Sequence, residues 1–142
     1  MTDAPKVGQI VEHHFLWLAE HAAGQFEGRK PRPCLIIAVE ERTGSAPRVT
    51  VLPITSQAPR GGTTALAVPR ELNARMGLDP KRDGWVVIDE ANIFAWPGFD
   101  LIPQPGGGFV RASVTAGFFT PVRGAVLAAQ PHGRPRRIER DE

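Results

Sequence analysis

Two short polar clusters carry the residue types that bind phosphate. The first cluster precedes an apolar run and holds three cations, Arg29, Lys30 and Arg32. The second follows another apolar run and holds hydroxyl and amide groups, Thr55, Ser56 and Gln57. If the two runs pair as an antiparallel hairpin, the clusters lie at the same end of it. Cations and hydroxyls then converge at one rim, which indicates a site for a phosphate or another anion.

The two apolar runs are the elements that must position these clusters. Residues 34–39 (CLIIAV) are continuously apolar, which predicts a strand buried on both faces. Residues 48–53 (RVTVLP) form the returning strand, and Thr43-Gly44-Ser45 between the runs is typical of a turn. Pro53 has no N–H to donate to a neighbouring strand, so we expect it at the end of this strand or at an edge.

The remaining predicted elements are short, and 15 glycines and 14 prolines make turns frequent. We expect strands at about 9–14, 65–68, 84–89 and 109–114, a short helix at 69–76 and a helical turn at 90–96. Thr120 and Pro121 are typical of a helix start, which predicts a helix through about Ala129. Short strands separated by turns favour a mainly β protein, a small barrel of antiparallel strands with a C-terminal helix.

Length and composition indicate one domain in a reducing compartment. The 142 residues suffice for a single core at 1–130, and the charged, proline-broken segment 131–142 is predicted to be a flexible tail. The single cysteine excludes an internal disulfide. The first residues are polar and no apolar run is long enough to span a membrane, so we expect a cytoplasmic protein.

The residues of the two polar clusters also have ordinary structural interpretations. Arg32 can be a strand-edge arginine in a surface ion pair, and Thr55 can simply bridge a turn. The net charge of +2 is too small to indicate a nucleic-acid partner by itself. Cations between Arg29 and Arg60 outnumber acids, and we interpret this excess as a phosphate-binding face, with a solvated face as the alternative.

The histidine, cysteine and tryptophan residues have side chains that can bind metal, pack in the core or stack on a base. His13 and His14 are adjacent, so on a strand they point to opposite faces and cannot easily bind one ion. With one cysteine and no typical ligand spacing, the sequence predicts no metal site and no cofactor. We interpret Cys34, Trp85 and Trp96 as core residues. Trp17 is the expected exposed aromatic residue.

The order of several motifs resembles that of a toxin family. RPCLII (32–37), VLPITSQ (51–57), MGLDP (76–80) and DGWVVIDEANI (83–93) are similar to the MazF/PemK toxins of bacterial type II toxin–antitoxin modules. The resemblance covers roughly residues 7–102. It implies an SH3-like small β-barrel of the CcdB/MazF/PemK type that usually forms a homodimer. The partner implied is a small antitoxin protein whose disordered tail covers the RNA groove.

The resemblance also implies a toxin activity, metal-independent cleavage of single-stranded RNA. The family's catalytic arginine and threonine fall on Arg32 and Thr55 in this sequence. A guanidinium can contact two phosphate oxygens and a hydroxyl can donate a third bond while the ribose 2′-hydroxyl attacks. His14 is a candidate general base, since histidine titrates near neutral pH. The other predicted RNA contacts are Arg29, Lys30, His14, Ser56, Gln57 and Arg60.

Two departures from the family pattern leave other functions open. The segment from Phe15 to Lys30 is longer than the corresponding family loop. Where the family often has a glutamine and, two residues later, a cation, this chain has Glu90 and Asn92, so we expect a basic RNA contact to be missing. The alternatives are a non-catalytic barrel that binds nucleic acid or a protein, and a gyrase-directed toxin of the same fold.

Overall fold

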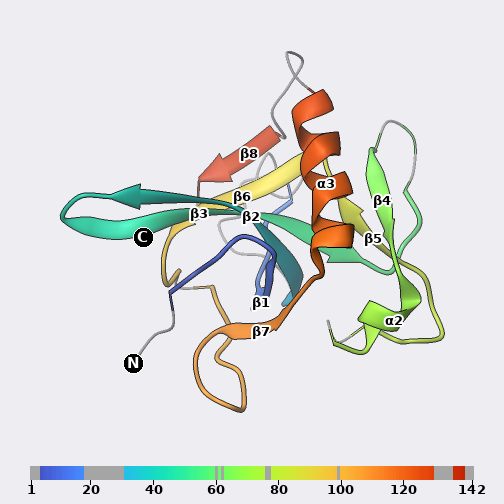
Figure 1. Ribbon diagram of the computed structural model, residues 1–142, viewed down its shortest axis with the longest axis horizontal. Coiled ribbons are helices and arrows are strands. Elements are labelled where there is room, and N and C mark those ends of the chain that lie inside the picture. The colour runs from blue at the N-terminus through green and yellow to red at the C-terminus, as the bar shows by residue number, and fades with distance from the viewer. Residues whose placement is uncertain are drawn as a thin grey trace.

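A computed structural model describes residues 4–17, 31–59, 61, 63–75, 78–98, 100–129 and 136–139. The described part is mainly β (Figure 1). Its strands are β1 (Gln9–His13), β2 (Arg32–Arg42), β3 (Ser45–Thr55), β4 (Ala65–Val68), β5 (Gly84–Val87), β6 (Glu90–Ala95), β7 (Val110–Ser113) and β8 (Arg136–Glu139). Its helices are α2 (Arg70–Asn73) and α3 (Ala116–Ala128).

The strands form one sheet in the order β4-β5-β3-β2-β1-β7. Strand β3 has β2 on one edge. On its opposite edge it pairs with β6 and, nearer its end, with β5. Strand β8 pairs with β6. Every pair is antiparallel except β6 with β8. Within the described strands, β4 and β7 end the path without pairing to each other, so hydrogen bonding does not close the sheet.

The predicted hairpin is the centre of this sheet. Strands β2 and β3 have 11 residues each and are joined at the turn that contains Gly44, whose φ of 74° suits a glycine. Strand β3 continues two residues past Pro53 to Thr55, so the prediction that Pro53 ends the strand is wrong. Pro53 lies where the neighbour of β3 changes from β6 to β5, so its missing N–H interrupts neither pairing.

The central strands carry buried residues on both faces of the sheet. Alternate residues of a strand point to opposite sides, so neighbouring positions belong to different core clusters. One core cluster lies under α3 and includes Ile10, Leu35 and Val122. In Figure 1 this helix runs along one face of the sheet. The other cluster uses the neighbouring positions Val11 and Cys34, together with aromatic residues of β6 and the loops. Full burial of Cys34, Leu35 and Ile36 confirms the interpretation of a central strand for the first half of the run 34–39, whereas Ala38 in the second half is exposed.

Three elements differ from the sequence prediction. Residues 90–96 were expected as a helical turn, but Glu90–Ala95 form β6, whose last four residues pair with Arg48 to Val51 of β3. Helix α3 begins at Ala116, four residues before the predicted cap, since the Thr115 side chain accepts a hydrogen bond from the backbone N–H of Phe118 (3.2 Å). Residues 136–139, inside the predicted flexible tail, form β8 beside β6.

Two short features complete the fold. Helix α2 is confined to Arg70–Asn73, and Pro69 occupies its N-cap position. The side chain of Asn73 is fully buried and donates to the carbonyl oxygen of Arg82 (2.7 Å), which holds the following turn against the helix. Neither described helix is long and apolar enough to cross a membrane.

Candidate functional site

The start of β2 and the end of β3 lie side by side at one rim of the sheet. Cys34 pairs with Pro53, and continuing this antiparallel register by two residues places Arg32 opposite Thr55. Arg32 also pairs with His13 of β1, and Thr55 pairs with Trp85 of β5. Each of the two residues is therefore held by neighbouring strands, and the predicted convergence of the two polar clusters is found for these members.

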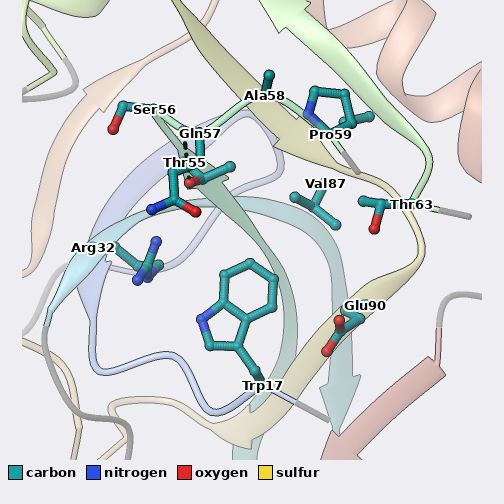
Figure 2. Close-up of a pocket in the computed structure, with 11 residues that line it drawn as sticks. Trp17, Arg32, Thr55, Ser56, Gln57, Ala58, Pro59, Thr63, Val87 and Glu90 are labelled. Atoms are coloured by element: carbon teal, nitrogen blue, oxygen red, sulfur yellow. Dashed lines mark hydrogen bonds between the residues drawn. The ribbon is translucent and has the colours of Figure 1, made fainter. Parts of the chain in front are cut away.

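A cavity of about 370 Å³ opens at this rim. Its walls come from the loop after β1, the ends of β2 and β3, the segment after β3, β4, β5 and the first residue of β6 (Figure 2). The lining residues are Trp17, Arg32, Thr55, Ser56, Gln57, Ala58, Pro59, Thr63, Ala65, Val87 and Glu90. Among the described residues, the cavity therefore combines one cation, one carboxylate, hydroxyl and amide groups and an apolar wall.

The guanidinium of Arg32 contacts an aromatic ring rather than a carboxylate. Its Cζ atom lies 5.2 Å from the centroid of the Trp17 ring, which is a cation–π contact. Its Nε is buried and has no hydrogen-bond partner among the described residues. No described carboxylate forms an ion pair with it, in contrast to Arg70, whose Nη2 lies 2.9 Å from Asp83 Oδ1. Among the described residues, the charge of Arg32 therefore has an aromatic neighbour and no carboxylate counter-ion.

Thr55 bridges a turn and also borders the cavity. Its Oγ1 accepts a hydrogen bond from the backbone N–H of Gln57 (3.2 Å), as the structural interpretation predicts. Accepting this bond leaves the hydroxyl proton for donation to another group. Ser56 and Gln57 follow directly and line the same cavity. The second predicted cluster is thus brought to the cavity as a unit.

Four other predicted site residues are not placed there. Arg29, Lys30 and Arg60 lie outside the described residues. His14 is partly buried, and its backbone N–H donates to the carbonyl of Asp100 (3.1 Å), but it does not line the cavity. Within the described part of the chain, no group of three or more histidine, cysteine or acidic residues gathers as metal ligands do.

Two cavity residues were not predicted as parts of the site. Trp17 was expected to be exposed, yet it is half-buried against Arg32, with Phe15 edge-on at 5.1 Å between ring centroids. The sequence marks Glu90 only as the replacement of a family glutamine. In the structure it is the first residue of β6 and lines the cavity. Trp17 reaches the site because β1 pairs with β2, and Glu90 because β6 pairs with β3. No local sequence pattern indicates that these two residues share a cavity.

Cys34 borders the site in sequence but does not supply a nucleophile. The side chain is fully buried, and its Sγ lies 3.5 Å from the carbonyl oxygen of Arg32. Burial raises the pKa of the Cys34 thiol far above its ordinary value. The positive charge of Arg32 opposes this shift, and Glu12 adds to it. The thiol therefore stays protonated, and the interpretation of Cys34 as a small core residue is confirmed.

Comparison with known proteins identifies a family. The family model of PemK-like, MazF-like toxins of type II toxin–antitoxin systems matches residues 7–94, more than half of the chain. The matched segment runs from β1 into β6 and contains Arg32, Thr55 and Glu90. No curated protein and no solved structure matches the chain. The match over most of the sheet shows that the chain belongs to the PemK-like, MazF-like toxin family of type II toxin–antitoxin systems.

Proposed function

We propose that this chain is a metal-independent endoribonuclease that cleaves single-stranded RNA. The observation that carries the proposal is the shared cavity of Arg32 and Thr55, in which the guanidinium has no described carboxylate partner. An arginine charge without a counter-ion among the described residues suits a phosphate ligand. The hydroxyl of Thr55 adds a second type of donor at the same rim.

The chemistry proposed is attack of a ribose 2′-hydroxyl on the adjacent phosphorus. A bond forms between the 2′-oxygen and phosphorus as the 2′-hydroxyl proton passes to water, and negative charge builds on the non-bridging oxygens. The bond to the 5′-oxygen breaks, and that oxygen takes a proton from water. Arg32 stabilises that charge with two N–H groups, and Thr55 donates a further hydrogen bond. The products carry a 2′,3′-cyclic phosphate and a 5′-hydroxyl. Arginine stays protonated and so does not accept the 2′-hydroxyl proton. His14 does not border the cavity, so we assign it no part in this step.

RNA contacts beyond the reacting phosphate are proposed for the residues around the rim. Ser56 and Gln57 line the cavity next to Thr55 and can bind the backbone of the RNA. Arg29, Lys30 and Arg60 precede or follow the same rim in sequence and supply further positive charge. Together they form the proposed phosphate-binding face.

Membership of the family supports further proposals about shape and assembly. We propose an SH3-like barrel, and the pairing of β3 with β2 on one edge and with β6 and then β5 on the other supports this proposal. We propose that two copies form a homodimer. A cognate antitoxin protein is proposed as the inhibitor, and the cytoplasm as the location.

The test is incubation of a long single-stranded RNA with the purified protein in EDTA. The proposal predicts fragments that end in a 2′,3′-cyclic phosphate and begin with a 5′-hydroxyl. Replacement of the ribose by deoxyribose at a mapped cleavage position removes the nucleophile and should abolish cleavage at that position alone. Cleavage that persists at the deoxyribose position, or that requires added metal, would contradict the proposed chemistry.

The acidic residue in the cavity favours one alternative, a module that binds RNA or protein without cleaving. Glu90 lines the cavity at the position of the family glutamine, and Asn92, at the position of the family cation, is fully buried. This chain therefore has less positive charge at that wall. Binding of RNA without cleavage by correctly folded protein would support the alternative.

A further inference from the structure

We propose that the cavity beside Arg32 and Thr55 is a guanine-binding subsite, in which the base stacks on Trp17 and pairs with the carboxylate of Glu90. The inference rests on the proposed function, because it names the base next to the phosphate that Arg32 binds. Arg32 and Thr55 are proposed to contact the phosphate, which is the same in every nucleotide, so these contacts give no sequence preference. A guanine subsite would add one.

The cavity is larger than a phosphate site needs to be. A volume of about 370 Å³ lies in the range of sites that enclose small organic ligands. Part of its lining is apolar, from Trp17, Ala58, Pro59, Ala65 and Val87. An apolar wall next to an aromatic ring suits the flat face of a nucleobase, and stacking on aromatic side chains is how exposed bases of single-stranded RNA are bound.

The polar groups of the cavity are divided between two sides. In the view of Figure 2, Arg32 lies on one side of the Trp17 indole and Glu90 on the other, near Val87. A carboxylate repels a phosphate, so a nucleotide enters with its phosphate at Arg32 and its base towards Glu90. Ionised carboxylates only accept hydrogen bonds, so the base edge that faces Glu90 must present donors.

Guanine is the base that meets this requirement best. Its Watson–Crick edge carries two adjacent donors, N1–H and the N2 amine, which match the two oxygens of a carboxylate. Adenine and cytosine each present one amine beside an acceptor nitrogen, and uracil presents one N–H between two carbonyls. In those three bases an acceptor faces a carboxylate oxygen. A bidentate contact of this kind discriminates between bases by roughly 10- to 100-fold.

The test compares base preference in the wild-type chain with that of two variants of equal charge change. Glu90→Gln alters the cavity, and Glu40→Gln alters an exposed glutamate of β2, outside the cavity lining, whose side chain is 69% exposed. Cleavage sites in a random single-stranded RNA are mapped in EDTA. Binding is measured separately with short 2′-deoxy oligonucleotides, which cannot be cleaved and which carry guanine, inosine, adenine, cytosine or uracil at one position.

The inference predicts cleavage next to guanine and binding of the guanine oligonucleotide roughly 10- to 100-fold tighter than that of the adenine, cytosine and uracil oligonucleotides. Inosine lacks the N2 amine, so its binding should fall between guanine and uracil. Glu90→Gln should remove the preference, and Glu40→Gln should keep it. The comparison of guanine with inosine uses only the wild-type chain, so it holds even if Glu90→Gln fails to fold.

The two readouts separate this inference from the proposed function. Cleavage without base preference, with equal binding of all oligonucleotides, would overturn the guanine subsite and leave the ribonuclease intact. A guanine preference that depends on Glu90 without any cleavage would support the subsite and overturn the ribonuclease. If Glu90→Gln changes the pH dependence of cleavage and keeps the base preference, Glu90 acts on a proton and the subsite is wrong.

Discussion

Asn92 holds the backbone of Leu16 through two hydrogen bonds. Its Nδ2 donates to the carbonyl oxygen of Leu16 (2.9 Å), and its Oδ1 accepts from the N–H of Leu16 (2.9 Å). The same Oδ1 lies 3.2 Å from Nε2 of His13, whose ring stacks on Phe94 at 4.8 Å between centroids. These contacts join β6 to the loop after β1, immediately before Trp17. Asn92 is therefore buried and supports the wall of the cavity.

Replacement of Asn92 by alanine should destabilise the fold. The change leaves the N–H and C=O groups of the buried Leu16 without their partner, and each unsatisfied buried group costs about 1–3 kcal/mol. We expect the free energy of unfolding to fall by about 2–4 kcal/mol, measured by urea denaturation. The control is Gln104→Ala, which removes an amide that is only partly buried and contacts Glu12 and Ile102. A loss equal to that of the control would show that the Leu16 contacts contribute little.

The start of α3 can be tested with two threonines. Thr115 caps the helix by accepting from Phe118 N–H, whereas Thr120 is exposed inside the helix. Thr115→Ala should lower the free energy of unfolding by about 1 kcal/mol, the usual cost of a lost N-cap. Thr120→Ala should be nearly neutral, since alanine is the better helix former. The reverse order in thermal or urea denaturation would place the helix start at Thr120 and contradict the observed cap.

These comparisons show which parts of the molecule the sequence can predict. The β2–β3 hairpin was predictable because a turn motif between two apolar runs is local information, and the convergence of Arg32 and Thr55 follows from the hairpin. Strand β6 was not, because Glu90, Ala91 and Asn92 have low intrinsic strand preference and become a strand only by pairing with β3 and β8.

The sequence prediction gave neither the start of α3 nor the cavity wall formed by Trp17 and Glu90, for related reasons. Thr115 and Thr120 both have the chemistry of a cap, and the proline after Thr120 favoured the wrong one, although α3 accommodates Pro121 in its interior. Trp17 and Glu90 meet in the cavity from segments more than 70 residues apart. Their contribution depends on the folded sheet, so no spacing in the sequence indicates it.

The buried thiol should make stability depend on pH in the alkaline range. Because burial raises the pKa of Cys34 in the folded chain, the unfolded chain releases the thiol proton first as pH rises above about 8.5. The contribution is complete below that pH and is lost above it. Between pH 8 and pH 10, the wild type should lose about 2 kcal/mol more stability than Cys34→Ala, measured by urea denaturation. Parallel pH profiles for the two proteins would mean that the thiol titrates normally in the fold.

Trp17 should assist cleavage by holding the guanidinium of Arg32. Cation–π contacts contribute about 0.5–2 kcal/mol, so Trp17→Ala should slow cleavage of single-stranded RNA by roughly 3- to 30-fold. Trp17→Phe keeps an aromatic face and should lose less. In an Arg32→Ala background the same tryptophan change should have a smaller effect, because the two residues act together. Equal effects in both backgrounds would show that Trp17 acts independently of Arg32.

The central claim is that Arg32 and Thr55 stabilise the charge that develops on the scissile phosphate. Its most direct test is the single-turnover rate constant for RNA cleavage in EDTA by the wild type, Arg32→Ala and Thr55→Ala, with Arg70→Ala as a control for loss of a surface cation. We predict that each site variant is slower by roughly 100- to 1000-fold, as when one donor to a developing anion is removed, and that Arg70→Ala is unchanged. Rates for the two site variants within a factor of about two of the wild type would contradict the claim.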